Sequence, residues 1–304
     1  MSPDRRSVAF GLIAGAAVAP SWSWADAPVA PVDPAAPVPD SVLAASVDLV
    51  GRMTVPVMVN GRGPFPFVVD TGSNRTVVSD ALVRQLSLPS SGVLQVRAAT
   101  ALARTPSVRV ADLAVGHRRL SDLQAPVMTL DNLGALGMLG IDAVVDQRLV
   151  MDFRKNQMEL TQTVRREPDP NTVVVQARSR YGQLLLVDSD AEGVPLYVIV
   201  DTGSENTLGN RAMREFLARR RIREVKVVGV TGDEAAADLG LLSELRVGKV
   251  LVRRQQIAYA DLYIFEHLGL HGKPSMLLGM STLRQCAKVS IDFPAREVRF
   301  LVEA

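Results

Sequence analysis

The 304-residue sequence contains a single cysteine, Cys286, and this scarcity limits the classes of protein to which it can belong. One cysteine allows no intramolecular disulfide, and it excludes zinc sites built from clustered cysteines and histidines. Neither sign of charge is in excess, because 34 Lys and Arg against 32 Asp and Glu give a formal net charge of +2. Charge therefore indicates neither nucleic acid nor an acidic surface as a partner.

Apolar runs of membrane length are also absent, and the run nearest to that length lies close to the N-terminus. Residues 8–19 are apolar, follow two arginines and precede two small-x-small sites. A spanning helix needs ~20 apolar residues, so this run is too short for one. We therefore predict an export signal over residues 1–27, cleaved after Ala25 or Ala27. A retained amphipathic anchor is the alternative.

The predicted signal has consequences for location and for the mature chain. An exported protein without disulfides fits the bacterial periplasm, reached by the twin-arginine or the general secretory route. No stable membrane span is expected after signal removal. Both tryptophans, Trp22 and Trp24, lie inside the signal, so the mature protein should contain none. Residues 28–45 are rich in proline and alanine and are predicted to form an extended tether.

The remaining sequence is dominated by short strand-like runs between turn residues, which predicts a mainly β fold. Residues 60–63, Asn-Gly-Arg-Gly, are a hairpin signal between two such runs, and Ser79-Asp80 are N-cap residues for a short helix. The predicted strands of the first half include Met53–Val59, Phe65–Val69, Val93–Val96, Ser107–Val115 and Val150–Phe153, and the predicted helix is Ala81–Leu86.

The chain repeats one motif, an apolar strand that leads a carboxylate into a glycine-containing turn. Val68–Ser73 reads VVDTGS and Ile199–Ser204 reads IVDTGS, so each half of the chain carries one such aspartate, Asp70 or Asp201. Later landmarks recur at slowly growing offsets, which is typical of a duplication with loop insertions. We therefore predict two similar lobes, 46–164 and 173–304, joined by a charged, proline-broken linker at 165–172.

Two carboxylates that face each other cannot both ionise easily, so they share a proton and titrate as a pair. Such a pair offers a general base and a general acid at the same moment. The surrounding residue types have reasons to be there. Glycine permits a sharp turn and close approach of two backbones, and the neighbouring hydroxyls can brace the opposite lobe or donate to the carboxylates. These supporting residues are Thr71, Gly72, Ser73, Thr202, Gly203 and Ser204.

The sequence resembles the aspartic proteases, and within them the bacterial retropepsin-like branch. The resemblance covers about residues 46–304 and rests on motif sites in matching order: Asp70-Thr71-Gly72-Ser73, Asp201-Thr202-Gly203-Ser204, Met138-Leu139-Gly140 and Leu277-Leu278-Gly279. It implies two β lobes with an active-site cleft between them, a catalytic dyad of Asp70 and Asp201, and an interlobe brace formed by the two threonines. It also implies a peptide or protein substrate, no cofactor and no metal.

In that family, hairpin flaps close over the substrate. An equal count back from Val115 and from Val247 gives flap candidates at Ala99 with Thr100 and at Thr231 with Gly232. Neither candidate carries the aromatic residue of the pepsin flap. The arginine that follows the second-motif glycine in retroviral enzymes is replaced by Ile141 and Met280.

Other patterns are better explained by structure than by function. His267 and His271 are four residues apart but have no third metal ligand, and the glycines at 134, 137 and 140 match no nucleotide fingerprint. The basic run at 219–223 suits a helix C-terminus, and no nucleic acid is expected as a partner. The sequence thus predicts an exported aspartic endopeptidase, monomeric because both lobes lie in one chain. A non-catalytic peptide-binding module on the same fold is the alternative.

Overall fold

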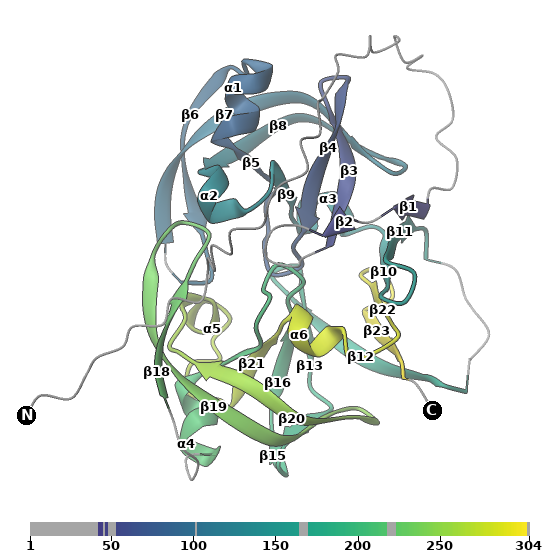
Figure 1. The fold of residues 1–304 in the computed structure, drawn as a ribbon, viewed down its shortest axis with the longest axis vertical. Helices are drawn as coiled ribbons and strands as arrows, with labels where there is room; N and C mark the ends of the chain where they lie inside the picture. Colours follow the sequence, from purple (N-terminus) through teal and green to yellow (C-terminus); the bar gives the residue numbers. More distant parts are fainter. Residues whose placement is uncertain are drawn as a thin grey trace, which may run out of the picture.

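A computed structural model describes residues 42–44, 46–47, 53–100, 102–163, 170–217 and 223–302. The predicted export signal, most of the tether and residues 165–169 of the predicted linker lie outside these ranges. Strands make up 55% of the structure and helices 13%, and the strands form two sheets across two repeated regions (Figure 1). The mainly β, two-lobed prediction is confirmed. Within the described ranges, no helix is both long and apolar enough to span a bilayer.

The N-terminal lobe is built on an eight-stranded sheet with the order β2-β3-β4-β9-β5-β8-β7-β6. Asn60 and Gly61 both have positive φ and join β3 to β4, which confirms the predicted hairpin. The Ser79 side chain accepts the Leu82 N–H and caps α1 as predicted. The elements are β2 (Ser46–Val47), β3 (Met53–Val59), β4 (Arg62–Val69), β5 (Val77–Ser79), α1 (Asp80–Leu86), β6 (Ser90–Arg97), β7 (Leu102–Val115), β8 (Arg118–Met128), α2 (Leu130–Leu133), β9 (Gly137–Leu139) and α3 (Ile141–Val144).

The C-terminal lobe repeats this arrangement. The strand before each motif, β4 or β16, pairs in parallel with a short strand that comes much later in the same lobe, β9 or β21. The elements are β13 (Gln183–Leu186), β14 (Ser189–Ala191), β15 (Val194–Pro195), β16 (Tyr197–Val200), β17 (Leu208–Gly209), α4 (Arg211–Leu217), β18 (Arg223–Val228), β19 (Glu234–Val247), β20 (Val250–Tyr259), α5 (Tyr263–His267), β21 (Ser275–Leu278) and α6 (Met280–Leu283).

Strands from both halves of the chain form one continuous layer between the lobes, in the order β1-β11-β10-β22-β23-β12 (Figure 1). The strands are β1 (Val42–Ala44), β10 (Arg148–Asp152), β11 (Gln157–Thr161), β12 (Thr172–Arg180), β22 (Lys288–Asp292) and β23 (Glu297–Leu301). The end of the predicted tether thus contributes a strand, β1. At the centre, β10 and β22 pair antiparallel and symmetrically about Val150 opposite Ser290, with opposite charges facing at both ends: Arg148 opposite Asp292, and Asp152 opposite Lys288.

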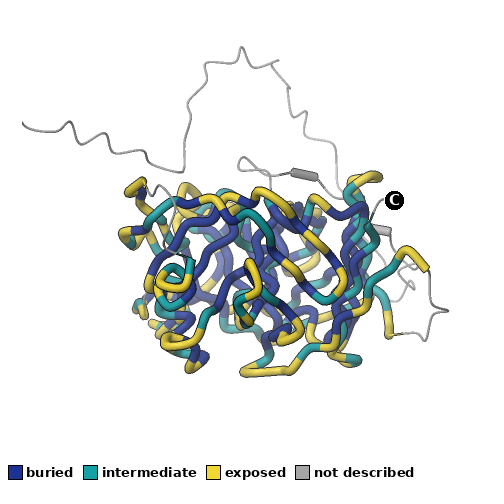
Figure 2. The backbone as a smooth tube through the Cα atoms, turned by 90° about the horizontal axis from the view of Figure 1, so that it is seen from below, coloured by how far each residue is buried: buried dark blue, intermediate teal, exposed yellow. Residues whose placement is uncertain are grey.

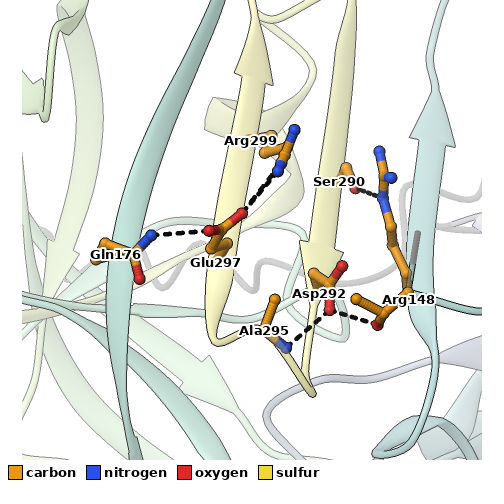
Figure 3. Close-up of polar contacts among 8 residues, drawn as sticks. Arg148, Gln176, Ser290, Asp292, Ala295, Glu297 and Arg299 are labelled. Atoms are coloured by element: carbon orange, nitrogen blue, oxygen red, sulfur yellow. Dashed lines mark hydrogen bonds and ion pairs between the residues drawn. The ribbon is translucent and has the colours of Figure 1, made fainter. Parts of the chain in front are cut away.

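Polar side chains in this interlobe layer are paired across neighbouring strands or along one strand, as Figure 3 shows. Arg148 is only 5% exposed, and its Nε donates to Ser290 Oγ at 2.6 Å across the junction of the two halves. Glu297 accepts from Gln176 Nε2 at 2.9 Å and forms an ion pair with Arg299 at 2.8 Å. Arg148 is buried and Glu297 and Arg299 are half-buried, and because all three have partners, the layer joins the lobes without unsatisfied polar groups at these positions.

The apolar core is continuous from one lobe to the other. One cluster of buried side chains includes Phe67 of β4, Leu149 of β10, Val289 of β22 and Val198 of β16. In Figure 2 the buried stretches run through the middle of the body, and exposed stretches lie at its turns. The two motifs therefore sit on strands that are fixed by packing on both sides of the junction.

Candidate active site

Each aspartate follows a buried strand and is held by the parallel strand beside it. Val69 and Val200, which precede the aspartates, are 1% and 2% exposed. The Asp70 N–H donates to the Leu139 carbonyl at 2.9 Å, and the Asp201 N–H donates to the Leu278 carbonyl at 3.1 Å. The parallel pairings of β4 with β9 and of β16 with β21 therefore fix the start of each turn.

The turns then wrap around their own carboxylates. Asp70 Oδ1 accepts the N–H groups of Gly72 and Ser73 at 2.7 and 3.1 Å. Asp201 Oδ1 accepts those of Gly203 and Ser204 at 3.0 and 3.2 Å. The backbone donors of each turn are thus directed at a single oxygen of its carboxyl group, and the two carboxyl groups are also hydrogen-bonded to each other.

The two turns approach so closely that only glycine fits at their tips. A Cβ atom built on Gly72 would lie 2.8 Å from Asp201 Cγ, and one built on Gly203 would lie 2.1 Å from Asp70 Cγ. These contacts explain why both turns carry glycine, which the sequence analysis attributes to close approach of the two backbones. The two aspartates, one from each half of the chain, are thereby brought together.

The two threonines form a reciprocal brace between the lobes. Thr71 Oγ1 donates to the Val200 carbonyl at 2.7 Å, and Thr202 Oγ1 donates to the Val69 carbonyl at 2.7 Å. The Thr71 N–H donates to Thr202 Oγ1 at 3.1 Å, and the Thr202 N–H donates to Thr71 Oγ1 at 3.2 Å. Both side chains are at most 3% exposed, so water does not replace these bonds readily.

The environment of Asp201 favours its protonated form. Burial, then the charge of Asp70, then a hydrogen bond between the two side chains raise the pKa of Asp201 well above its usual range. The N–H groups of Gly203 and Ser204 act in the opposite direction but do not overcome these effects. Asp201 therefore remains a proton donor at a pH where an exposed aspartate would be ionised.

The predicted donation from the serine hydroxyls to the carboxylates is wrong. Ser73 Oγ donates to the Arg75 carbonyl at 2.9 Å, and Ser204 Oγ donates to the Asn206 carbonyl at 2.8 Å. A hydroxyl has one proton to donate, so each is used within its own turn. The serines contribute to the carboxylates through their backbone N–H groups instead.

Sequence reasoning missed a further set of hydrogen bonds that holds the two motif turns, made by one threonine in each lobe. Thr76 Oγ1 donates to Asp142 Oδ1 at 2.7 Å and accepts the Gly140 N–H at 3.2 Å. In the other lobe, Thr207 Oγ1 accepts the Gly279 N–H at 3.2 Å. The available signal was a threonine six residues after each aspartate, at equivalent positions of the two copies.

A glutamine outside both motifs also contacts the site. Gln183, at the start of β13, is 3% exposed, and its Nε2 donates to the Gly72 carbonyl at 2.6 Å. Its Oε1 is buried and has no hydrogen-bond partner among the described residues. The contact crosses 111 residues of sequence, and no local pattern predicts it.

All four flap candidates lie in turns between long strands. Ala99 and Thr100 connect β6 to β7, and Thr231 with Gly232 connects β18 to β19. The two turns meet, because a Cβ atom built on Gly229 would lie 2.2 Å from Thr100 Oγ1. In Figure 1 the β18 hairpin extends from the lower lobe toward the end of β6.

Each hairpin turn also contacts a short helix of the opposite lobe. The Ile264 N–H of α5 donates to the Ala99 carbonyl at 3.2 Å. A Cβ atom built on Gly232 would lie 2.9 Å from Nδ2 of Asn132, which belongs to α2. The two hairpins therefore touch each other and both lobes.

The polar groups at the site are those of acid–base chemistry. Across the part of the chain that the structure describes, no three His, Cys, Asp or Glu side chains are grouped in a way that could hold a metal ion. Cys286 is buried, and burial raises the pKa of its thiol to about 11. It belongs to the apolar core that extends through both lobes.

Comparison with known proteins agrees with this geometry. A family model described as aspartyl protease matches residues 55–143 and 187–282, one region in each lobe, and each region contains one of the two aspartates. A comparison with curated proteins found no match. The matched regions cover more than half of the chain, and the chain therefore belongs to the aspartyl protease family, in its two-lobed, retropepsin-like form.

Proposed function

We propose that the protein is an aspartic endopeptidase in which Asp70 and Asp201 form the catalytic dyad. The observation that carries the proposal is the reciprocal packing of the two turns, in which each glycine lies against the carboxyl group of the other lobe. Membership of the aspartyl protease family supports peptidase activity in general. The assignment of these two residues rests on the geometry of the site.

The raised pKa of Asp201 favours one shared proton on the pair of carboxyl groups, and we assign that proton to Asp201. Asp201, protonated, donates to the oxygen of the scissile carbonyl, while Asp70 accepts a proton from a water held between the carboxyl groups. The water oxygen adds to the carbonyl carbon and gives a tetrahedral diol. Collapse of the diol breaks the C–N bond as Asp70 passes its proton to the leaving nitrogen, and Asp201 recovers its proton from the diol.

The hairpins at Ala99–Thr100 and Thr231–Gly232 are proposed to cover a bound peptide. Their mutual contact requires them to part before a peptide enters, so substrate access depends on their opening. Opening would separate Ala99 from the Ile264 N–H and from the apolar cluster around α5 on which it packs.

A peptide-library digest tests the proposal directly. The wild-type mature protein should cleave peptides without added metal, whereas Asp70→Asn and Asp201→Asn should abolish cleavage while leaving the thermal unfolding transition cooperative. The control is Asp188→Asn, which removes an exposed carboxyl group elsewhere in the C-terminal lobe and should keep full activity. Full activity in either dyad variant would refute the assignment. Peptide binding without cleavage by the wild type would favour the non-catalytic alternative.

We also propose that the protein acts on protein substrates in the bacterial cell envelope. The support is the sequence pattern of residues 1–27, which is that of an export signal. Fractionation of cells that express the full chain should recover a shortened protein from the periplasm. Recovery of the full-length chain in the cytoplasm would contradict this location.

A further inference from the structure

A group of aromatic and cationic side chains beside the dyad takes no part in the proposed mechanism. Tyr181 stacks on His267, with ring centroids 4.7 Å apart, and Tyr263 also stacks on His267, at 6.1 Å. Burial lowers the pKa of His267, and the nearby charges of Arg97 and Arg180 lower it further. Both arginines are exposed. We call these five residues the basic aromatic cluster.

The cluster is attached to the active site through each of the three elements that carry it. Arg97 ends β6, two residues before Ala99 at the tip of the N-terminal hairpin. The helix α5, which carries Tyr263 and His267, donates the Ile264 N–H to Ala99. These contacts place one side of the cluster against the N-terminal hairpin, which is proposed to cover a bound peptide.

The third element, the turn between β12 and β13, is tied to the dyad itself. Arg180 ends β12, and Tyr181 follows it in the turn. The next residues reach the motif turn of the N-terminal lobe, since Gly182 lies against Ile141 and Gln183 donates to the Gly72 carbonyl. The elements that carry the cluster therefore contact both the hairpin tip and the Gly72 turn, so on the proposed function a peptide across the dyad would pass close to them.

No anion matches the charges of the cluster within the part of the chain that the structure describes. Among the described residues, no carboxylate forms an ion pair with Arg97 or Arg180, and the two charged groups that act on His267 are these same arginines. A Cβ atom built on Gly269 would lie 3.0 Å from Arg180 Nη2, so the guanidinium group lies over the end of α5. Two guanidinium groups beside stacked aromatic rings are a suitable site for a carboxylate with an apolar stem.

We propose that the basic aromatic cluster is a substrate subsite that binds a carboxylate of the peptide, either an Asp or Glu side chain or a C-terminal carboxylate. This inference rests on the proposed function, because it assigns the chemistry of the substrate to the same site. The guanidinium groups of Arg97 and Arg180 hold the carboxylate, and the exposed ring of Tyr181 covers its aliphatic stem.

The test separates binding from cleavage by using the Asp70→Asn variant. Randomised peptides retained by this variant should be enriched in Asp and Glu. Selected peptides should bind about fivefold more tightly than their Gln-substituted forms, since one exposed ion pair supports a preference of that size. Peptides with a free and an amidated C-terminus distinguish the two sources of the carboxylate.

Further substitutions in the same background assign the preference to the cluster. Arg180→Gln and Arg97→Gln should each reduce the ratio of acidic to amide binding, and the double variant should abolish it. Arg62→Gln removes an exposed arginine at the far end of β4 from Asp70 and should leave the ratio unchanged. The proposal is overturned if the Asp70→Asn variant binds acidic and amide peptides equally, or binds neither. It is also overturned if the additional Arg97→Gln and Arg180→Gln substitutions leave the ratio of acidic to amide binding unchanged.

Cleavage by the wild-type protein is the separate readout for the proposed function. If the wild type cleaves peptides without any preference for acidic residues, the subsite fails and the endopeptidase assignment stands. If the Asp70→Asn variant selects acidic peptides but the wild type cleaves none, the endopeptidase assignment fails and the carboxylate site stands.

Discussion

Replacing Thr71 by valine should weaken the junction between the lobes and remove most of the activity. Valine keeps the shape of threonine but loses the hydroxyl, which donates to the Val200 carbonyl at 2.7 Å and accepts the Thr202 N–H at 3.2 Å. The substitution therefore leaves the Val200 carbonyl and the Thr202 N–H without these hydrogen bonds. Thr71 and Thr202 are at most 3% exposed, so water cannot readily replace them.

The size of the effect follows from these two orphaned groups. Each buried group that loses its partner costs about 1–3 kcal/mol, so the two groups together should lower the free energy of unfolding by about 2–6 kcal/mol. For a protein of this size, that loss corresponds to a decrease in Tm of roughly 4–24 °C. Thr202→Val should have a similar effect, because it removes the symmetric pair of bonds to Val69 and Thr71.

The assay compares unfolding in urea with peptide cleavage. Thr105→Val is a control, since Thr105 is buried and donates one hydrogen bond, to Val127 within the N-terminal lobe; it should cost about half as much. The threonine brace positions the two carboxyl groups of the dyad. Because a displacement of about 1 Å in catalytic groups reduces the rate about 100-fold, kcat should fall by about that factor in Thr71→Val. Equal stability of Thr71→Val and Thr105→Val, with kcat unchanged in both, would refute the brace.

The other predictions concern protonation, close packing and export. Because Asp201 has a raised pKa in the folded state, its proton stabilises the fold below the pKa of the unfolded chain, and this contribution is lost as the pH rises through the raised value. The free energy of unfolding of Asp201→Asn, minus that of the wild type, should therefore increase between pH ~3 and neutral pH. The increase should be about 1.4 kcal/mol for every pH unit that separates the folded-state pKa of Asp201 from its pKa in the unfolded chain. If urea unfolding gives a difference that does not change with pH, this reasoning is wrong. The kcat/KM of the wild type should fall as the pH rises past the same pKa. Gly203→Ala should reduce kcat by about 100-fold or more, because its Cβ would overlap the opposite carboxyl group, whereas Gly272→Ala, which meets nothing within 4 Å, should not. Finally, the exported protein should show no tryptophan fluorescence and a mass that matches cleavage after Ala25 or Ala27; indole emission would exclude that cleavage.

The duplication made most of the architecture predictable. A motif that occurs twice predicts two lobes and opposed aspartates without any knowledge of strand register, because the symmetry places the copies together. The same logic located the hairpin turns, since Ala99 and Thr231 were found by an equal distance from Val115 and Val247. Both residues lie in the turns of long hairpins.

Two kinds of feature could not be predicted from the sequence: those that depend on the local shape of a turn, and those that join segments far apart in the chain. The orientation of Ser73 Oγ follows from the shape of the turn, which brings the Arg75 carbonyl within reach of the hydroxyl. The pairing of Thr76 with Asp142 spans 66 residues, and the contact of Gln183 with Gly72 spans 111. The basic aromatic cluster draws on β6, the β12–β13 turn and α5, which are brought together only by the folded lobes.

The symmetric register of β10 and β22 has a consequence for how such a chain could arise. Each strand carries a cation at one end and an aspartate at the other, Arg148 with Asp152 and Lys288 with Asp292, around a central residue. Because of this pattern, an antiparallel pairing of β10 with a second β10 would also place arginine opposite aspartate, and two copies of β22 would likewise place lysine opposite aspartate. Each half of the chain thus carries the charge pattern that a symmetric pairing of two identical copies would need.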